Sequence, residues 1–220
     1  MLQGGWTLMM TEVAHRTVVT NEIRMHLAEV GEGPLVLLCH GFPELWYSWR
    51  HQLSAIAEAG FRAVAPDMRG YGQTDRPEAI DQYTVFHMVG DMVGLLDALG
   101  ADQAIIAGHD WGAAVASQAA QLRPDRFRGV IGLSVPFRAR APARPTTIMP
   151  QTGDMIWYQL YFQEPGVARR NTTAMCVRSS TPARSRSRGT RCPARGLSAW
   201  CRARGARSGG TPLRRRCLAG

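Results

Sequence analysis

The stretch Gly108-His109-Asp110-Trp111-Gly112-Ala113 decides the fold of this chain. An apolar run, residues 103–107, precedes it, and a helical pattern from Ala114 to Leu122 follows. We therefore predict a strand, a tight turn and a helix, with a carboxylate at the apex of the turn. Small residues at positions 108 and 112 suit a sharp turn, because a Cβ there would collide with the neighbouring helix or strand. An apical Asp in place of Ser predicts a nucleophile that attacks carbon and forms an ester.

Apolar runs alternate with helical patterns on both sides of this stretch. Residues 35–39 and 62–66 are short apolar runs typical of strands buried on both faces. Helices are predicted over 46–59 and 84–99, ended by Gly60 and Gly100. Further strands are predicted over 15–20, 23–30 and 126–134. The alternation predicts an α/β fold, a mostly parallel sheet with flanking helices.

The charged residues are distributed unevenly. The sequence has 26 Arg and no Lys, and 12 of the Arg lie in residues 171–220, which hold no acid. All 17 acids lie in residues 1–170, so the formal net charge of +9 describes the tail and not the mildly acidic body. Arg, Pro, Ser and Gly in the tail predict disorder. Four of the five Cys also lie there, without a C-x-x-C pair or a His, which argues against a zinc site.

Composition predicts four segments. Residues 1–11 are expected to be an N-terminal extension, with Met1 or Met10 as the true start. Residues 12–136 form the N-terminal part of the core, 137–168 begin a lid, and 169–220 form the Arg-rich tail. Acids vanish after Ala168 while Arg, Cys, Ser and Pro surge, as in a GC-rich gene read in the wrong frame. We expect a frameshift there, so that the sheet is truncated before its last strands.

The sequence shows neither a secretory signal nor a membrane-spanning segment. The N-terminus shows no basic segment followed by an apolar core, and no apolar stretch approaches the roughly 20 residues of a membrane span. The sequence therefore predicts a cytoplasmic protein without a membrane partner.

Two loops and one aromatic segment supply further candidate site residues. His40-Gly41-Phe42-Pro43 follows a buried strand, and the backbone N–H groups of Phe42 and Trp111 are predicted to converge on one oxygen. Residues 67–72, a Gly-rich loop, are expected to hold an internal ion pair between Asp67 and Arg69. His109 is interpreted as a supporting residue and not a base, because adjacent side chains at a strand end point apart. The aromatic segment 157–166 suits a lid.

Four motifs, taken in order, carry a family resemblance. His-Gly-Phe-Pro, Asp-Met-Arg-Gly-Tyr-Gly, Gly-His-Asp-Trp-Gly-Ala and Tyr-Gln-Leu-Tyr-Phe-Gln-Glu-Pro-Gly-Val together resemble the soluble epoxide hydrolases of the α/β-hydrolase superfamily over residues 12–168. The resemblance implies that Asp110 opens the epoxide and becomes an alkyl ester, while Tyr158 donates a hydrogen bond to the epoxide oxygen. It implies an oxyanion hole from Phe42 and Trp111, no metal or cofactor, and a substrate pocket lined by His40, Pro43, His109 and Trp157.

Three parts of that family's site have no match here. A second lid tyrosine, an orienting acid and a histidine base lie downstream in the family, whereas the last of the six His in this chain is His109. The chain is therefore expected to be defective in converting epoxides to diols. Two alternatives stay open, a haloalkane dehalogenase-like hydrolase and a non-catalytic product with a polyanion-binding tail. The expected partners are a small apolar epoxide and water, with no specific nucleic acid, and the oligomeric state stays open.

Overall fold

The computed structural model describes residues 12–137, 139, 141–149, 151–152, 155–168, 170 and 200–202. The chain divides into two compact units, Met1–Arg138 and Ala139–Gly220. The predicted extension over residues 1–11 lies outside the described residues, as does most of the predicted tail. Within the described ranges, none of the helices has the length and apolar character that a bilayer span requires.

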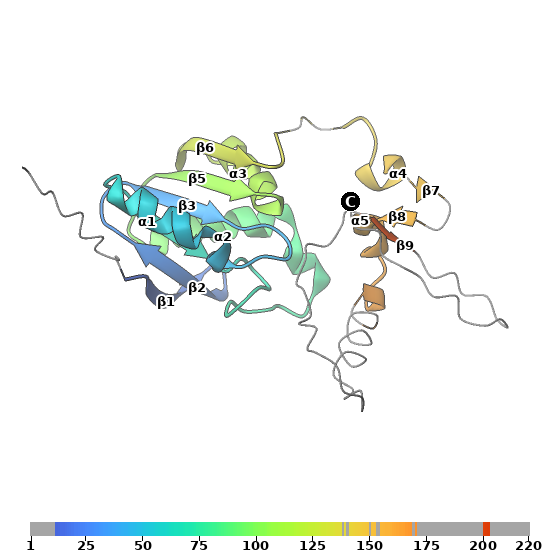
Figure 1. The fold of residues 1–220 in the computed structure, drawn as a ribbon, viewed down its shortest axis with the longest axis horizontal. Coiled ribbons are helices and arrows are strands. Elements are labelled where there is room, and N and C mark those ends of the chain that lie inside the picture. Colours follow the sequence, from blue (N-terminus) through green and yellow to red (C-terminus); the bar gives the residue numbers. More distant parts are fainter. Residues whose placement is uncertain are drawn as a thin grey trace, which may run out of the picture. The chain divides into compact units, whose positions relative to one another are not determined.

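The first unit is built on a six-stranded sheet with the order β1-β2-β4-β3-β5-β6 (Figure 1). Strands β4, β3, β5 and β6 run parallel to one another, and β2 is antiparallel to both β1 and β4. The predicted mostly parallel sheet is therefore confirmed. The strands are β1 Ala14–Thr20, β2 Ile23–Val30, β3 Leu35–Cys39, β4 Arg62–Pro66, β5 Ala104–His109 and β6 Phe127–Leu133.

Helices cover both faces of this sheet. Helix α1 (Arg50–Glu58) packs on one face, and α2 (Val85–Ala98) and α3 (Trp111–Leu122) pack on the other. Alternate residues of β3 serve the two cores, with Leu37 facing α2 and α3 and Leu38 facing α1. This two-sided burial explains why the middle strands read as unbroken apolar runs.

The predicted helix ends agree with the structure. Gly60 and Gly100 have φ of 85° and 67°, the left-handed conformation that ends a helix without a Cβ clash. Thr84 caps α2, because its hydroxyl oxygen accepts the N–H of His87. The helix predicted over 46–59 begins as a 3₁₀ turn, η1 (Trp46–Trp49), before α1; a second 3₁₀ turn, η2 (Ile80–Tyr83), precedes α2.

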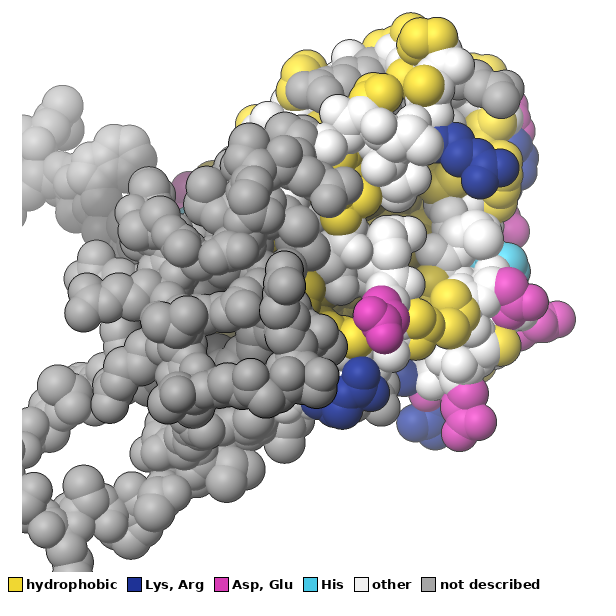
Figure 2. Space-filling model, turned by 90° about the vertical axis from the view of Figure 1, so that its right-hand side faces the viewer, with side chains coloured by type: hydrophobic (Ala, Val, Ile, Leu, Met, Phe, Trp, Pro, Cys, Tyr) yellow, Lys and Arg dark blue, Asp and Glu magenta, His cyan; other side chains and the backbone are white. Residues whose placement is uncertain are grey.

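The strand β6 lies at the outer edge of the sheet. Phe127 at its start is buried, but Val130, Ile131 and Leu133 are 47%, 50% and 43% exposed. On the face shown in Figure 2, hydrophobic side chains lie at the surface among polar and charged ones. The strand predicted over 126–134 is thus present, and the side chains of its second half are exposed to solvent.

The second unit contains short elements only. A three-stranded antiparallel sheet has the order β7-β8-β9, and β9 differs from the expectation of an irregular tail. Backbone hydrogen bonding to β8 needs no periodic side-chain pattern, so this strand could not be predicted from the residues of the tail. The elements are α4 Pro145–Ile148, β7 Gln151–Thr152, β8 Met155–Trp157, α5 Tyr158–Tyr161 and β9 Trp200–Arg202.

Candidate active site

The turn between β5 and α3 places Asp110 at a sharp apex. Asp110 has φ 52° and ψ −119°, a conformation that residues with a side chain rarely adopt. A Cβ built on Gly108 would lie 2.1 Å from the carbonyl oxygen of Gly112, and one on Gly112 would lie 2.1 Å from the carbonyl oxygen of Cys39. Both glycines are therefore required by close backbone approach, as the sequence predicted.

The loop after β3 crosses the apex at close range. The backbone N–H of Phe42 donates to Oδ1 of Asp110 at 3.0 Å. A Cβ on Gly41 would lie 2.5 Å from Cβ of Asp110, so only glycine lets the loop approach this far. Trp111 supplies the first N–H of α3, next to Asp110 at the N-cap. Helix α3 thus begins directly at the residue that carries the apical carboxylate.

Glu44 joins this loop to the strand end, a role that the sequence reasoning missed. Its Oε2 accepts the N–H of Gly41 at 3.1 Å, and its Oε1 lies 3.0 Å from Nδ1 of His109. The available signal was an acid directly after Pro43, in a loop expected to meet the residues around Asp110. Among the described residues, His109 makes no hydrogen bond to Asp110, which agrees with a supporting role.

His40 lies inside the protein and not on the expected pocket wall. The residue is 1% exposed, Nε2 accepts the N–H of Met68 at 2.9 Å, and Nδ1 lies 2.8 Å from the carbonyl oxygen of Gly41. A backbone N–H can only donate, so the imidazole proton sits on Nδ1. Burial lowers the pKa of His40, in agreement with a neutral ring. His40 therefore braces the loop, and the assignment to the pocket is corrected.

The predicted ion pair between Asp67 and Arg69 is wrong. Arg69 pairs instead with Asp91 of α2, through Nε–Oδ2 at 2.9 Å and Nη2–Oδ1 at 2.5 Å, with both side chains buried. The hydrogen bond to Asp91 raises the pKa of the Arg69 guanidinium. Packing of α2 against β1 brings an acid from a distant part of the sequence to this arginine, which local spacing does not reveal. Asp67 has other partners, Trp46, Gln73 and His26.

The remaining predicted site residues fall into two groups. In the first unit, Pro43 is exposed and the Trp111 side chain is 46% exposed. In the second unit, Trp157 and Tyr158 are half-buried, with ring centroids 5.5 Å apart. The amide of Gln159 donates to the Tyr158 hydroxyl at 3.2 Å. The structure thus brings Asp110, Phe42, His109 and their loop together in the first unit, and it places the rings of Trp157 and Tyr158 in contact in the second.

No group of three or more His, Cys, Asp or Glu side chains in the described part of the chain is arranged to hold a metal ion. The carboxyl ends of β3, β4 and β5 carry His40, Asp67 and Asp110, respectively. This is the edge where open α/β sheets bind ligands, at the point where the strand order reverses.

The fold and this apex together define a hydrolase of the α/β type. The family model described as "alpha/beta hydrolase fold" matches residues 34–189, and the chain belongs to that family. The matched range continues past Ala168, where the composition changes.

Two proteins named as epoxide hydrolases are similar in sequence to this chain. The chain is 48% identical over 185 residues to "Epoxide hydrolase 3" of Siraitia grosvenorii, covering 79% of this chain and 58% of that protein. It is 51% identical to "Epoxide hydrolase A" of Mycobacterium tuberculosis, covering 70% and 48%.

Solved structures of epoxide hydrolases are also similar to this chain. An epoxide hydrolase from Vigna radiata matches with a TM-score of 0.68 and 52% identity, covering 71% of this chain and 49% of that chain. Epoxide Hydrolase A from Mycobacterium thermoresistibile matches with a TM-score of 0.71 and 48% identity, covering 76% and 54%. The chain spans about half the length of the relatives that it matches.

Proposed function

We propose that the chain carries the nucleophile of an epoxide hydrolase, and that Oδ2 of Asp110 attacks the less hindered epoxide carbon. The observation that carries this proposal is the Phe42 N–H on Oδ1 of Asp110 at a positive-φ apex. Because Oδ1 is held by that donor, Oδ2 is the oxygen left to attack. Oδ1 then becomes the carbonyl oxygen of the ester and, when water adds, the oxyanion.

Ring opening also needs a proton for the epoxide oxygen. The carbon–oxygen bond breaks as the Asp110 ester forms, and we assign the proton to the Tyr158 hydroxyl, on the family resemblance. The N–H of Trp111 is the second oxyanion donor in this scheme, and the assignment of Pro43 and Trp157 to the substrate pocket rests on the family resemblance. The names of the similar proteins support an epoxide as the substrate.

Hydrolysis of the ester is the step at which we expect this chain to fail. No histidine follows His109 in the sequence, and His109 itself is paired with Glu44. A positioned general base contributes about 10²–10⁴-fold to such a step. The 220-residue chain is therefore expected to form the ester and to release diol slowly.

Incubation with styrene oxide tests both steps. Intact-mass and peptide mass spectrometry of the wild-type chain should show one styrene oxide bound on Asp110, while Asp110→Asn shows none. Asp102→Asn, an exposed acid just before β5, is the matched control and should label like the wild type.

Equal labelling of Asp110→Asn would overturn the nucleophile assignment. Steady diol production at ordinary enzyme rates would overturn the slow second step. Halide release from a chloroalkane, without reaction with epoxides, would favour the dehalogenase alternative.

We propose, separately, that the segment after Ala168 is read out of the family's frame. Its fourteen Arg without an acid support this reading. Sequencing the surrounding DNA decides the matter. A single clean frame through codons 168–189 that continues into a longer gene would remove the proposal.

A further inference from the structure

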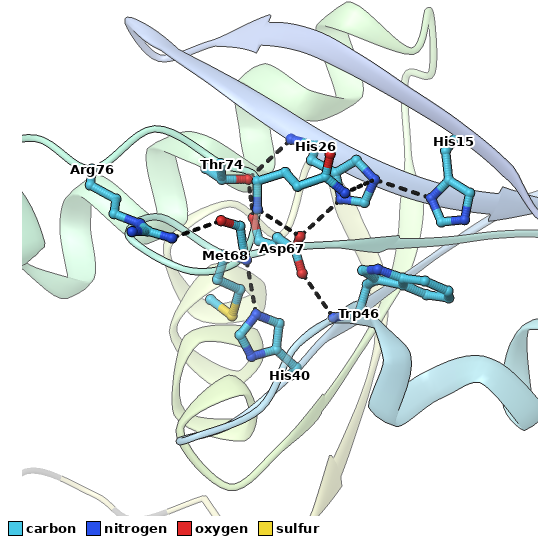
Figure 3. Close-up of polar contacts among 10 residues, drawn as sticks. His15, His26, His40, Trp46, Asp67, Met68, Thr74 and Arg76 are labelled. Atoms are coloured by element: carbon cyan, nitrogen blue, oxygen red, sulfur yellow. Dashed lines mark hydrogen bonds and ion pairs between the residues drawn. The ribbon is translucent and has the colours of Figure 1, made fainter. Parts of the chain in front are cut away.

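A line of polar side chains runs through the protein beneath the loop of the candidate site (Figure 3). Asp67 and His26 are 1% and 3% exposed, and Oδ2 of Asp67 lies 2.9 Å from Nδ1 of His26. On its other side, Nε2 of His26 lies 3.1 Å from Nδ1 of His15, an exposed residue of β1 whose ring is nearly parallel to that of His26. None of these residues has a part in the proposed chemistry.

The donors around Asp67 determine how this line is protonated. The backbone N–H groups of Trp46 and Gln73 donate to Oδ1 and Oδ2 at 3.0 and 3.1 Å. With His26, three groups therefore converge on one carboxylate, which serves as acceptor for all of them. A ring proton of His26 therefore lies on Nδ1, facing Oδ2 of Asp67, while Nε2 faces Nδ1 of His15 at 3.1 Å and the side-chain amide of Gln73 at 3.4 Å.

Asp67 and Met68, which are adjacent in the sequence, hold the two ends of the loop 40–46 that crosses Asp110. Oδ1 of Asp67 fixes the N–H of Trp46 at the far end of the loop, and the N–H of Met68 fixes Nε2 of His40 at the near end. Phe42 lies between these two anchors. Since the Phe42 N–H must stay within hydrogen-bonding distance of Oδ1 of Asp110, any slackening of either anchor moves the donor away.

We propose that His26 and Asp67 are positioning residues, which set the place of the Phe42 N–H without touching the substrate. His26 holds one oxygen of Asp67 so that the other oxygen keeps the Trp46 end of the loop in register. His15 and the side-chain amide of Gln73 contact the outer nitrogen of His26, on the side away from Asp67. The effect on reaction rate rests on the function proposed for Asp110, whereas the effect on the loop does not.

Two substitutions of similar size test this proposal. In His26→Asn the side-chain amide nitrogen takes the place of Nδ1 and can still donate to Asp67. In His26→Gln the amide nitrogen takes the place of Nε2, toward His15, and the donor to Asp67 is lost. His51→Asn, at an exposed position of α1, is the control for replacing a histidine.

Hydrogen–deuterium exchange of a peptide spanning residues 40–48 is the first measurement. Exchange of this peptide should rise about tenfold or more in His26→Gln, as expected for loss of one hydrogen bond to a charged group, and should stay near the wild type in His26→Asn. A peptide covering β5 should be unchanged in both variants. The second measurement is the rate of Asp110 labelling by styrene oxide, which should fall in His26→Gln and recover in His26→Asn.

Equal exchange of the loop in the two variants would overturn the proposal. Exchange that rises equally over β5 would also overturn it, because the pair would then support the whole sheet and not the loop. Should no protein, the wild type included, be labelled by styrene oxide, the proposed function fails, and the exchange data alone decide the role of His26.

Discussion

Two neighbouring strands, β5 and β6, run parallel and are both largely apolar, yet they differ in burial. In β5 every residue is buried or half-buried. In β6 only Phe127 is buried, and the four consecutive residues 130–133 are all exposed. Helix α3 packs against both strands. The difference is that β5 has a strand on each side and β6 has one on a single side. Apolar composition thus predicts that a strand forms, but the position of the strand in the sheet decides how deeply its side chains are buried.

The largest expected effect comes from adding one methyl group to each strand. Gly108→Ala of β5 should destabilise the first unit by more than about 4 kcal/mol, because the new Cβ meets the backbone of Gly112 at 2.1 Å. Gly129→Ala of β6 is the control, since its Cβ would have its nearest neighbour at 3.6 Å. Urea unfolding followed by circular dichroism measures both, and equal stabilities would break the comparison.

Truncation of one isoleucine in each strand sharpens the comparison. Ile106→Ala removes a fully buried side chain of β5 and should cost about 2–5 kcal/mol of unfolding free energy. Ile131→Ala removes a side chain that is 50% exposed and should cost less than about 1 kcal/mol. The same urea unfolding curves give the two values, and a cost at Ile131 as large as that at Ile106 would contradict the ranking.

A charge on the exposed strand should change association more than stability. Ile131→Lys places a charge on an outer strand, where lysine hinders edge-to-edge pairing, and should lower light scattering of the concentrated protein. Thr17→Lys, on the outer strand β1 at the opposite edge, is the matched control and should leave scattering unchanged. Unaltered scattering in Ile131→Lys would show that β6 is not the surface through which chains associate.

The smallest effect concerns β3, the other neighbour of β5, and appears only at high pH. Burial raises the pKa of the Cys39 thiol from 9.0 to about 12. Above pH 9 the unfolded chain loses this proton while the folded chain keeps it, so the stability falls as the pH rises. The loss is about 1.4 kcal/mol per pH unit between these values and is absent at pH 7.

Unfolding curves at pH 7 and pH 10 measure this loss, with Cys39→Ala as the variant that should not show it. Iodoacetamide should likewise fail to modify Cys39 at pH 8 until urea unfolds the chain, because only the thiolate reacts. Rapid modification in the folded state would contradict the burial of β3.

Much of the fold could be predicted from the sequence, because its signals are local. The strands at 23–30, 35–39 and 62–66 agree with the structure to the residue, since turn residues bound each apolar run. The apex at Asp110 could be predicted for the same reason, as Gly108 and Gly112 mark its close contacts. In the second unit the pattern is weaker, and the aromatic segment 157–166 contains the last residue of β8 and all of α5, two short elements that its composition does not separate.

What could not be predicted depends on partners far apart in the sequence. Arg69 selects Asp91 and not Asp67, because the packing of α2 decides which carboxylate arrives. Glu44 and His109 meet only when the loop after β3 folds over the end of β5. His40 looked like a pocket residue by its motif, yet the backbone at Gly41 and Met68 occupies both of its ring nitrogens.

The backbone at Asp110 is strained at the tip of the turn between β5 and α3. A side chain held at φ 52° costs on the order of 1 kcal/mol or more, and glycine would relieve that cost. On backbone grounds alone glycine would therefore suit this position better than aspartate. Under the function proposed for Asp110, that strain is the cost of holding the carboxylate at the tip of the turn, beside the N–H of Phe42.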